Sequence, residues 1–200
     1  MPAEQPDLES DVRSLVARVL DGVLEGPDAG TADASVVESG ADISAPDGKS
    51  IAIASDHGGY ELKRGLAAKL ADAGYAVLDL GTDSAEACDY PDFAHAVARQ
   101  VAKGNCAWGI MIDGAGIGSA MVANKVPGVR AAACYDISTA RNSREHNRAN
   151  VLTLGAGLTG AGLAWQIVQE WLATPWGGDR HLRRVALINE IEEMYARSEA

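Results

Sequence analysis

The chain has 200 residues, the size of one domain with or without an appendage. Its hydrophobic fraction of 47% and charged fraction of 22% are typical of a globular protein and exclude disorder along the whole chain. The formal net charge of -11 argues against a nucleic-acid partner, because phosphates are bound by basic surfaces. No run of about 18 apolar residues predicts a membrane span, and the acidic N-terminus does not resemble a signal peptide. With three widely spaced cysteines and no CxxC pair, we expect a cytoplasmic protein with reduced thiols.

Residues 1–24 predict an amphipathic helix. Apolar residues recur at helical spacing from Leu8 to Leu24, Asp7 is a candidate N-cap, and Gly26-Pro27 ends the pattern. Residues 25–49 are rich in Gly, Ala, Ser, Asp and Pro, a composition that predicts a flexible linker.

Two interpretations of this helix stay open. In the first, its apolar face packs on the chain's own domain or on a second copy of the chain. In the second, it is a targeting segment, because a short amphipathic helix on a Gly/Pro/Ala-rich tether resembles the encapsulation peptides that recruit enzymes into bacterial microcompartments. That resemblance implies a shell protein or a cargo enzyme as the partner of residues 8–24, and a location inside a microcompartment.

Residues 50–200 alternate between short apolar runs and helical patterns. Strands are predicted at residues 51–54, 77–80, 108–112, 130–134 and 151–154, and helices near residues 60–73, 92–103, 117–124, 137–146, 160–173 and 180–196. This alternation predicts an α/β domain, a three-layer Rossmann-like fold with a five-stranded parallel sheet.

The residues that follow the predicted strands are polar or glycine. They are residues 55–59, 81–83, 113–119, 135–136 and 155–157. Because ligands bind beyond the carboxyl ends of such strands, these segments together predict a cleft, and we group Arg144-Glu145-His146-Asn147 at the end of a helix with them.

The glycine run at residues 114–118 leads from a strand into a helix. Its backbone N–H groups could hold an anion, or the run could simply be a tight packing turn. It is not a GxGxxG fingerprint in register and no Walker lysine follows it, so no nucleotide cofactor is expected. The four histidines (57, 95, 146 and 181) show no HxH or HxxxH spacing, so no metal is expected.

Five separated motifs resemble those of the ribose-5-phosphate isomerase B family, which includes the galactose-6-phosphate isomerase subunits. They are Ser55 to Tyr60, Asp89-Tyr90-Pro91, the glycine turn with Ala123-Asn124-Lys125, Arg144 to Asn147, and Arg180 to Arg184. The resemblance covers about residues 50–195. It implies a metal-free aldose–ketose isomerase that interconverts ribose 5-phosphate and ribulose 5-phosphate through a cis-enediolate.

The resemblance also implies a role for each matching residue. His146 would assist ring opening, and Asn147 with the backbone N–H groups of residues 114–118 would stabilise the enediolate oxyanion. Asp56 and Tyr90 would contact sugar hydroxyls. The other implied substrate contacts are His57, Arg180 and Arg184 at the phosphate, and Gly114, Gly116, Gly118 and Arg144. The family's sites lie between two subunits, which implies a homodimer, while pairing of dimers into tetramers stays open.

Two positions nearest the chemistry depart from the family pattern. Many members carry cysteine directly before the glycine turn and others carry glutamate after it, but this chain has Asp113 and Ser119 there. We interpret Asp113 as the base that removes the C2 proton, with Ser119 beside it, because carboxylates can catalyse enolisation. In the alternative, Asp113 only caps the turn or the next helix.

Three functions stay open from the sequence. The first is isomerisation of a pentose phosphate. The second is the same reaction on a tetrose or hexose phosphate. The third is a catalytically silent member that binds sugar phosphates or serves as a structural partner.

Overall fold

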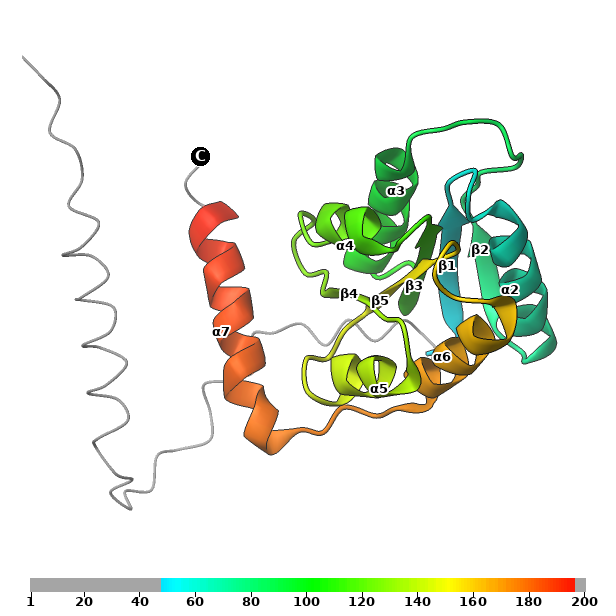
Figure 1. Cartoon of the computed structure of the whole chain (residues 1–200). Helices are drawn as coiled ribbons and strands as arrows, with labels where there is room; N and C mark the ends of the chain where they lie inside the picture. Colours follow the sequence, from blue (N-terminus) through cyan, green and yellow to red (C-terminus); the bar gives the residue numbers. More distant parts are fainter. Residues whose placement is uncertain (1–47, 197–200) are drawn as a thin grey trace, which may run out of the picture. The chain divides into compact units, whose positions relative to one another are not determined.

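The computed structural model describes residues 48–196, and Figure 1 shows the arrangement of their helices and strands. The helix predicted over residues 1–24 and nearly all of the linker predicted over residues 25–49 lie outside the described residues. None of the helices in the described part is both long and apolar enough to cross a membrane.

Five strands form one parallel sheet. They are β1 (Ser50–Ser55), β2 (Ala76–Asp79), β3 (Trp108–Asp113), β4 (Ala131–Ala133) and β5 (Val151–Gly155), in the spatial order β2-β1-β3-β5-β4. The direction of travel across the sheet reverses between β1 and β3, which is where open α/β sheets bind ligands. The predicted α/β fold with a five-stranded parallel sheet is confirmed.

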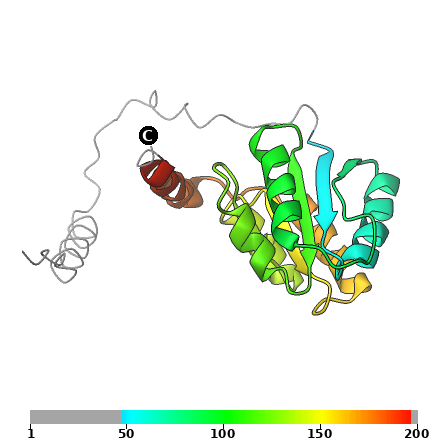
Figure 2. The same ribbon diagram turned by 90° about the horizontal axis from the view of Figure 1, so that it is seen from above.

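Helices cover both faces of this sheet. They are α2 (Tyr60–Asp72), α3 (Tyr90–Ala102), α4 (Ile117–Ala123), α5 (Ile137–Glu145), α6 (Ala161–Ala173) and α7 (Asp179–Ala196). The pair α3 and α4 packs on one face, and α2, α5 and α6 pack on the other, as the view in Figure 2 shows.

The two faces of the sheet carry side chains of different size. Large residues lie under α2, α5 and α6, namely Ile51, Ile53, Ile110, Ile112, Leu152 and Leu154. Smaller or unbranched residues lie under α3 and α4, among them Ala52, Ala54 and Met111. Alternate residues of a strand point to opposite faces of the sheet. Because helices cover both faces, β1, β3 and β5 are buried on both sides and consist mainly of apolar residues.

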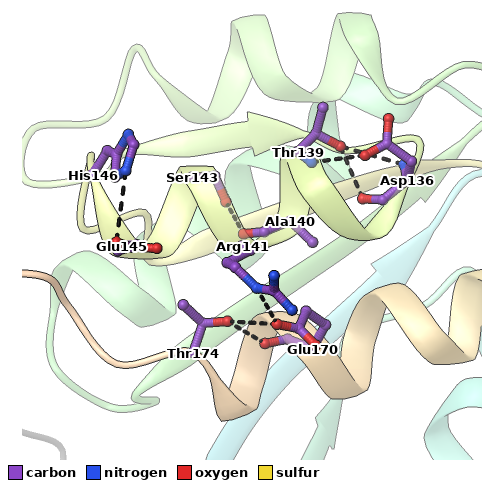
Figure 3. A network of polar contacts seen from close by, with 9 residues as sticks. All are labelled: Asp136, Thr139, Ala140, Arg141, Ser143, Glu145, His146, Glu170 and Thr174. Atoms are coloured by element: carbon purple, nitrogen blue, oxygen red, sulfur yellow. Dashed lines mark hydrogen bonds and ion pairs between the residues drawn. The ribbon is translucent and has the colours of Figure 1, made fainter.

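Helix α5 carries the chain from one edge of the sheet to the other. It begins after β4 with a capping box, in which the Asp136 carboxylate accepts a hydrogen bond from Thr139 N at 2.8 Å. It ends at Glu145, and the chain then enters β5 at Val151, whose register partners are Gly109 and Ala131. Both ends of α5 are visible in Figure 3. Gly109 and Ala131 lie at the start of β3 and β4. Helix α5 therefore ends near the edge of the sheet where the strands begin, the amino edge.

Arg144 fixes the end of α5 to the rest of the core. Only 7% of the residue is exposed, and its guanidinium lies 4.1 Å from the ring centroid of Trp108 and 5.0 Å from that of Trp171. Its Nη1 donates a hydrogen bond of 2.6 Å to Ala149 O. Burial, and then the positive charges of Arg148 and Arg130, lower the pKa of Arg144 to about 10. Arg144 is therefore a structural cation held between two indole rings.

The segment just before α7 contacts the end of α5. Gly177 N donates to Glu145 O at 2.9 Å, and His181 and Val185 are buried. Farther along the helix, Glu192 accepts a hydrogen bond of 2.8 Å from Gly128 N. Four large apolar side chains of α7 are nevertheless 44–66% exposed, namely Leu187, Ile188, Ile191 and Met194. This helix thus carries an apolar face that the described residues do not cover.

We expect Arg144→Lys to lower the free energy of unfolding by roughly 2–3 kcal/mol, because an ammonium group cannot lie flat between two indoles. Arg141→Lys, on the same helix, is the matched control. Arg141 pairs with Glu170 at 2.7 Å, but its side chain is 57% exposed, so the expected loss of stability is much smaller than for Arg144→Lys. Urea denaturation measures both values, and equal losses would contradict the structural role of Arg144.

Candidate active site

The end of β1 is tied to the segments around it by two polar side chains. The Asp56 carboxylate accepts a hydrogen bond of 2.9 Å from Gly59 N, and only 8% of this residue is exposed. His57 is exposed, and its Nδ1 accepts a hydrogen bond of 3.3 Å from Cys88 N. This second contact joins the loop after β1 to the segment that leads into α3, so both sequence-predicted residues lie at the carboxyl edge of the sheet.

The Asp113 carboxylate holds the glycine turn after β3 in place. Its Oδ1 accepts from Ala115 N at 2.8 Å and from Gly116 N, and its Oδ2 accepts from Ser119 N at 3.1 Å and from the Ser119 hydroxyl. Asp113 is 5% exposed and Ser119 is fully buried. Four donors on one carboxylate are the geometry expected of a cap, which is the alternative that the sequence left open. Before it could accept a proton, Asp113 would have to release one of these donors.

The same hydrogen bonds decide which N–H groups of the turn could face a ligand. Those of Ala115 and Gly116 point back to Asp113. Within residues 48–196, the N–H groups of Gly114, Ile117 and Gly118 have no acceptor. The expected oxyanion contacts therefore narrow to these three groups.

Glycines are required where this turn meets its neighbours. Gly116 has φ of +80°, and a Cβ atom there would lie 3.0 Å from the carbonyl carbon of Leu154 at the end of β5. A Cβ atom on Gly118 would lie 2.7 Å from the Tyr90 hydroxyl. The phenol of Tyr90 thus lies directly against the turn, with 37% of the residue exposed. The structure brings together one carboxyl-edge group: Asp56, His57, Tyr90, Asp113, Gly114, Gly116, Gly118 and Ser119.

The remaining predicted residues form a second group where α5 ends and α7 begins. This amino-edge group consists of His146, Asn147, Arg180 and Arg184. His146 follows directly on α5, and Glu145 Oε1 lies 3.7 Å from His146 Nε2 and 3.7 Å from Arg180 Nη2. Arg184 acts electrostatically on His181, which stacks on His146.

A single chain does not bring the two groups together. Gly116 of the carboxyl-edge group touches the end of β5, whereas His146 and Asn147 precede its first residue, Val151. The five residues of β5 span about 15 Å at the usual rise of a strand. Grouping residues 144–147 with the strand ends was therefore wrong for one chain, because the helix after β4 returns the chain to the opposite edge.

Arg144 belongs to neither group, because it lies in the core. The sequence motif implied a substrate contact, but the guanidinium is packed between Trp108 and Trp171 and is bonded to Ala149 O. The guanidinium Nε has no hydrogen-bond partner within residues 48–196, but the residue is only 7% exposed, so the structure places Arg144 in the core and not at an open substrate site. The structure therefore does not support the implied substrate contact of Arg144.

Sequence reasoning missed His181. Its ring centroid lies 4.2 Å from that of His146, with 17° between the ring planes, and it is only 6% exposed. Its position one residue after Arg180 in a basic motif was the only signal, and nothing in that spacing predicts a stacked pair. Among the described residues, no three or more His, Cys, Asp or Glu side chains are arranged to hold a metal ion.

Comparison with known proteins matches residues 51–188 to the family model described as Ribose/Galactose Isomerase. Ribose-5-phosphate isomerase B of Escherichia coli K12 is 43% identical over 145 residues, which cover 72% of this chain and 97% of the relative. A putative sugar phosphate isomerase of Bacillus subtilis is 40% identical over 144 residues, with the same coverage of 72% and 97%.

Solved structures agree with this assignment. The ribose-5-phosphate isomerase B of Clostridium thermocellum is 51% identical, with a TM-score of 0.72, and the match covers 73% of this chain and 99% of that one. The enzyme from Mycoplasma genitalium, solved with bound ribulose-5-phosphate, is 40% identical with a TM-score of 0.70, and the match covers 72% and 96% of the two chains. The chain described here therefore belongs to the ribose/galactose isomerase family.

Proposed function

We propose that this chain is a cytoplasmic isomerase that interconverts ribose 5-phosphate and ribulose 5-phosphate through a cis-enediolate. The observation that carries this proposal is the similarity, over nearly the whole length of the relative, to a structure that holds ribulose-5-phosphate. The glycine turn supports it, because N–H groups with no acceptor in the described part of the chain lie beside the Tyr90 hydroxyl, where they could stabilise an oxyanion.

We propose further that two copies of the chain form a homodimer whose active sites lie between the subunits. The support is geometric, since the carboxyl-edge and amino-edge groups are about a strand length apart in one chain. A second copy could supply the missing group to each site. Exposed apolar side chains on α4 and α7, among them Met121 at 64% and Ile191 at 56%, would be buried by such a contact.

In this composite site each group has a separate task. The carboxyl-edge group of one subunit contacts the sugar through Asp56 and Tyr90 and stabilises the enediolate oxyanion at the glycine turn, with His57 near the phosphate. The partner subunit's His146 assists opening of the furanose ring, and the partner subunit's Asn147 adds an oxyanion contact. The partner's Arg180 and the partner's Arg184 bind the phosphate, for which guanidinium groups suit the bidentate geometry.

We keep Asp113 as the proposed base for the C2 proton, with a condition that its contacts impose. The hydroxyl of Ser119 is the one donor of the four that can rotate away without moving the backbone. That rotation frees one lone pair on Oδ2, which gives Ser119 a part in the proton transfer. In the enediolate the proton of the C2 hydroxyl moves to O1, and the proton taken from C2 is then returned to C1, which yields the ketose.

For residues 1–49 we propose an amphipathic helix and a linker that direct the enzyme to a bacterial microcompartment through a shell or cargo protein. The support is the helical spacing of apolar residues from Leu8 to Leu24 and the Gly/Pro/Ala-rich stretch that follows. Residues 50–200 would then form the isomerase domain.

The purified chain should convert ribose 5-phosphate to ribulose 5-phosphate faster than it isomerises four-carbon or six-carbon sugar phosphates. A coupled assay over such a panel, compared by kcat/KM, measures this preference. If kcat/KM is higher for a tetrose or hexose phosphate, that sugar phosphate is the substrate. If no sugar phosphate of the panel is turned over, the catalytically silent alternative is favoured.

Asp113→Asn should lower kcat roughly 10²–10⁴-fold with KM nearly unchanged, because an amide cannot take the C2 proton. Asp113→Cys, which installs the residue common in the family, should recover turnover even though its thermal midpoint falls with the loss of the cap. Ser119→Ala is the control that removes one donor and leaves the carboxylate. If Asp113→Asn keeps more than about a tenth of wild-type kcat, Asp113 is a cap and not the base.

Mixed dimers of Asp113→Asn and His146→Asn chains should regain activity that neither homodimer has. If each site combines the carboxyl-edge group of one subunit with the amino-edge group of its partner, a mixed dimer contains one site with no substitution. Random exchange would then restore about a quarter of the wild-type sites. The readout is isomerase activity after the two variants are unfolded and refolded together, and no recovery despite measured subunit exchange would contradict the shared site.

A further inference from the structure

Two imidazole rings stack where α5 ends and α7 begins. His146 closes α5, and His181 is the third residue of α7. Their ring centroids are 4.2 Å apart and their planes differ by 17°. His181 is buried, whereas 35% of the His146 side chain is exposed, so one ring faces solvent and the other supports it from the protein side.

The polar contacts of each ring assign its protons. Asn142 Nδ2 lies 2.9 Å from His146 Nδ1, and an amide nitrogen only donates, so Nδ1 accepts and the proton is on Nε2. Arg180 Nε lies 2.8 Å from His181 Nε2 and also only donates, which leaves the His181 proton on Nδ1. In each ring, one nitrogen therefore accepts a hydrogen bond from a neighbouring side chain.

The surroundings of His181 disfavour its charged form. Burial is the main cause that lowers the pKa of His181, followed by the charges of His146, Arg180 and Arg184, and Glu145 alone opposes them. Glu145 Oε1 is 3.7 Å from His146 Nε2, a contact drawn in Figure 3. A proton added to His146 would place a cation against a ring that two arginines already surround.

A glycine allows the start of α7 to approach the end of α5 closely. Gly177 passes between the two helices, where a Cβ atom would lie 3.0 Å from Glu145 O and 3.3 Å from His181 Cδ2. Its N–H donates to Glu145 O at 2.9 Å. This close approach brings the start of α7 against the end of α5 and sets the stacking distance.

We propose that His181 is a positioning residue for His146: by stacking on the His146 ring it fixes the plane of that ring, whose tautomer is set by Asn142, so that Nε2–H is held in one direction for proton transfer in ring opening. The inference deepens the proposed function, since ring opening of a furanose phosphate is the step that it serves. His181 itself does not touch the substrate in this account.

His181→Leu tests the inference because it fills a similar volume and removes the flat ring on which His146 stacks. The His146 ring should then lose its fixed plane, and its NMR signals in the free protein, assigned by comparison with His146→Asn, should move and broaden. His181→Phe restores a flat ring and should recover isomerisation of ribose 5-phosphate.

A second readout separates ring opening from enolisation. Ribulose 5-phosphate is open-chain, and exchange of its C1 proton with deuterated solvent needs only the enediolate step. His181→Leu should slow isomerisation of ribose 5-phosphate about tenfold or more, while this exchange stays within about twofold of wild type. His95→Leu is the matched control, since His95 is an exposed residue of α3, and it should change neither quantity.

The outcomes distinguish this inference from the proposed function. If the His146 ring signals of His181→Leu equal those of wild type, or if exchange and isomerisation fall together, His181 has no positioning role. If wild type does not isomerise ribose 5-phosphate, the proposed function fails, but the NMR signals still decide whether His181 orients His146. Should His181→Leu not fold, His181→Gln keeps an acceptor for Arg180 without an aromatic ring and is read by the same signals and exchange.

Discussion

The direction of the parallel strands is the constraint on which the site depends. Every strand of the sheet ends at the same edge, and each crossover helix carries the chain back to the other edge. The glycine turn after β3 and the end of α5 must therefore lie on opposite edges, whatever their side chains are. Residues that act on one small molecule from both positions need two chains. The proposed shared site follows from topology before any side chain is considered.

Each half of the proposed site is held by a buried charged group that does not need to contact the substrate in order to matter. At the carboxyl edge, the Asp113 carboxylate collects three backbone N–H groups and the Ser119 hydroxyl, which sets the shape of the turn. At the amino edge, the Arg144 guanidinium between two indoles fixes the last turn of α5, directly before His146. Asp113 and Arg144 both occur in sequence motifs that also contain residues expected to contact the substrate. A motif alone therefore does not distinguish a residue that supports the site from one that contacts the substrate.

The sequence allowed the sheet and the carboxyl-edge group to be predicted, because apolar runs and the residues after them are local signals. Both ends of all five strands lie within one residue of the predicted positions. The sequence did not predict that the two groups lie at opposite edges of the sheet. A helix of nine residues carries the chain from one edge to the other, and nothing in its composition indicates this. The burial of Arg144 and the stacking of His181 depend on Trp108, Trp171 and Gly177, which are distant in sequence from at least one of their partners. Such contacts are set by packing and cannot be derived from spacing.

The acidic balance of the chain is compatible with an anionic substrate because the charge is unevenly placed. Residues 1–50 hold 11 of the 28 acidic residues and 3 of the 17 basic residues, so residues 51–200 are close to neutral. Exposed charges farther apart than a Debye length of about 8 Å are largely screened at physiological salt. In the proposed site, a phosphate group therefore meets the local positive charge of Arg180 and Arg184 on α7. The electrostatics of binding are set within one helical turn of α7 and are largely independent of the net charge of the chain.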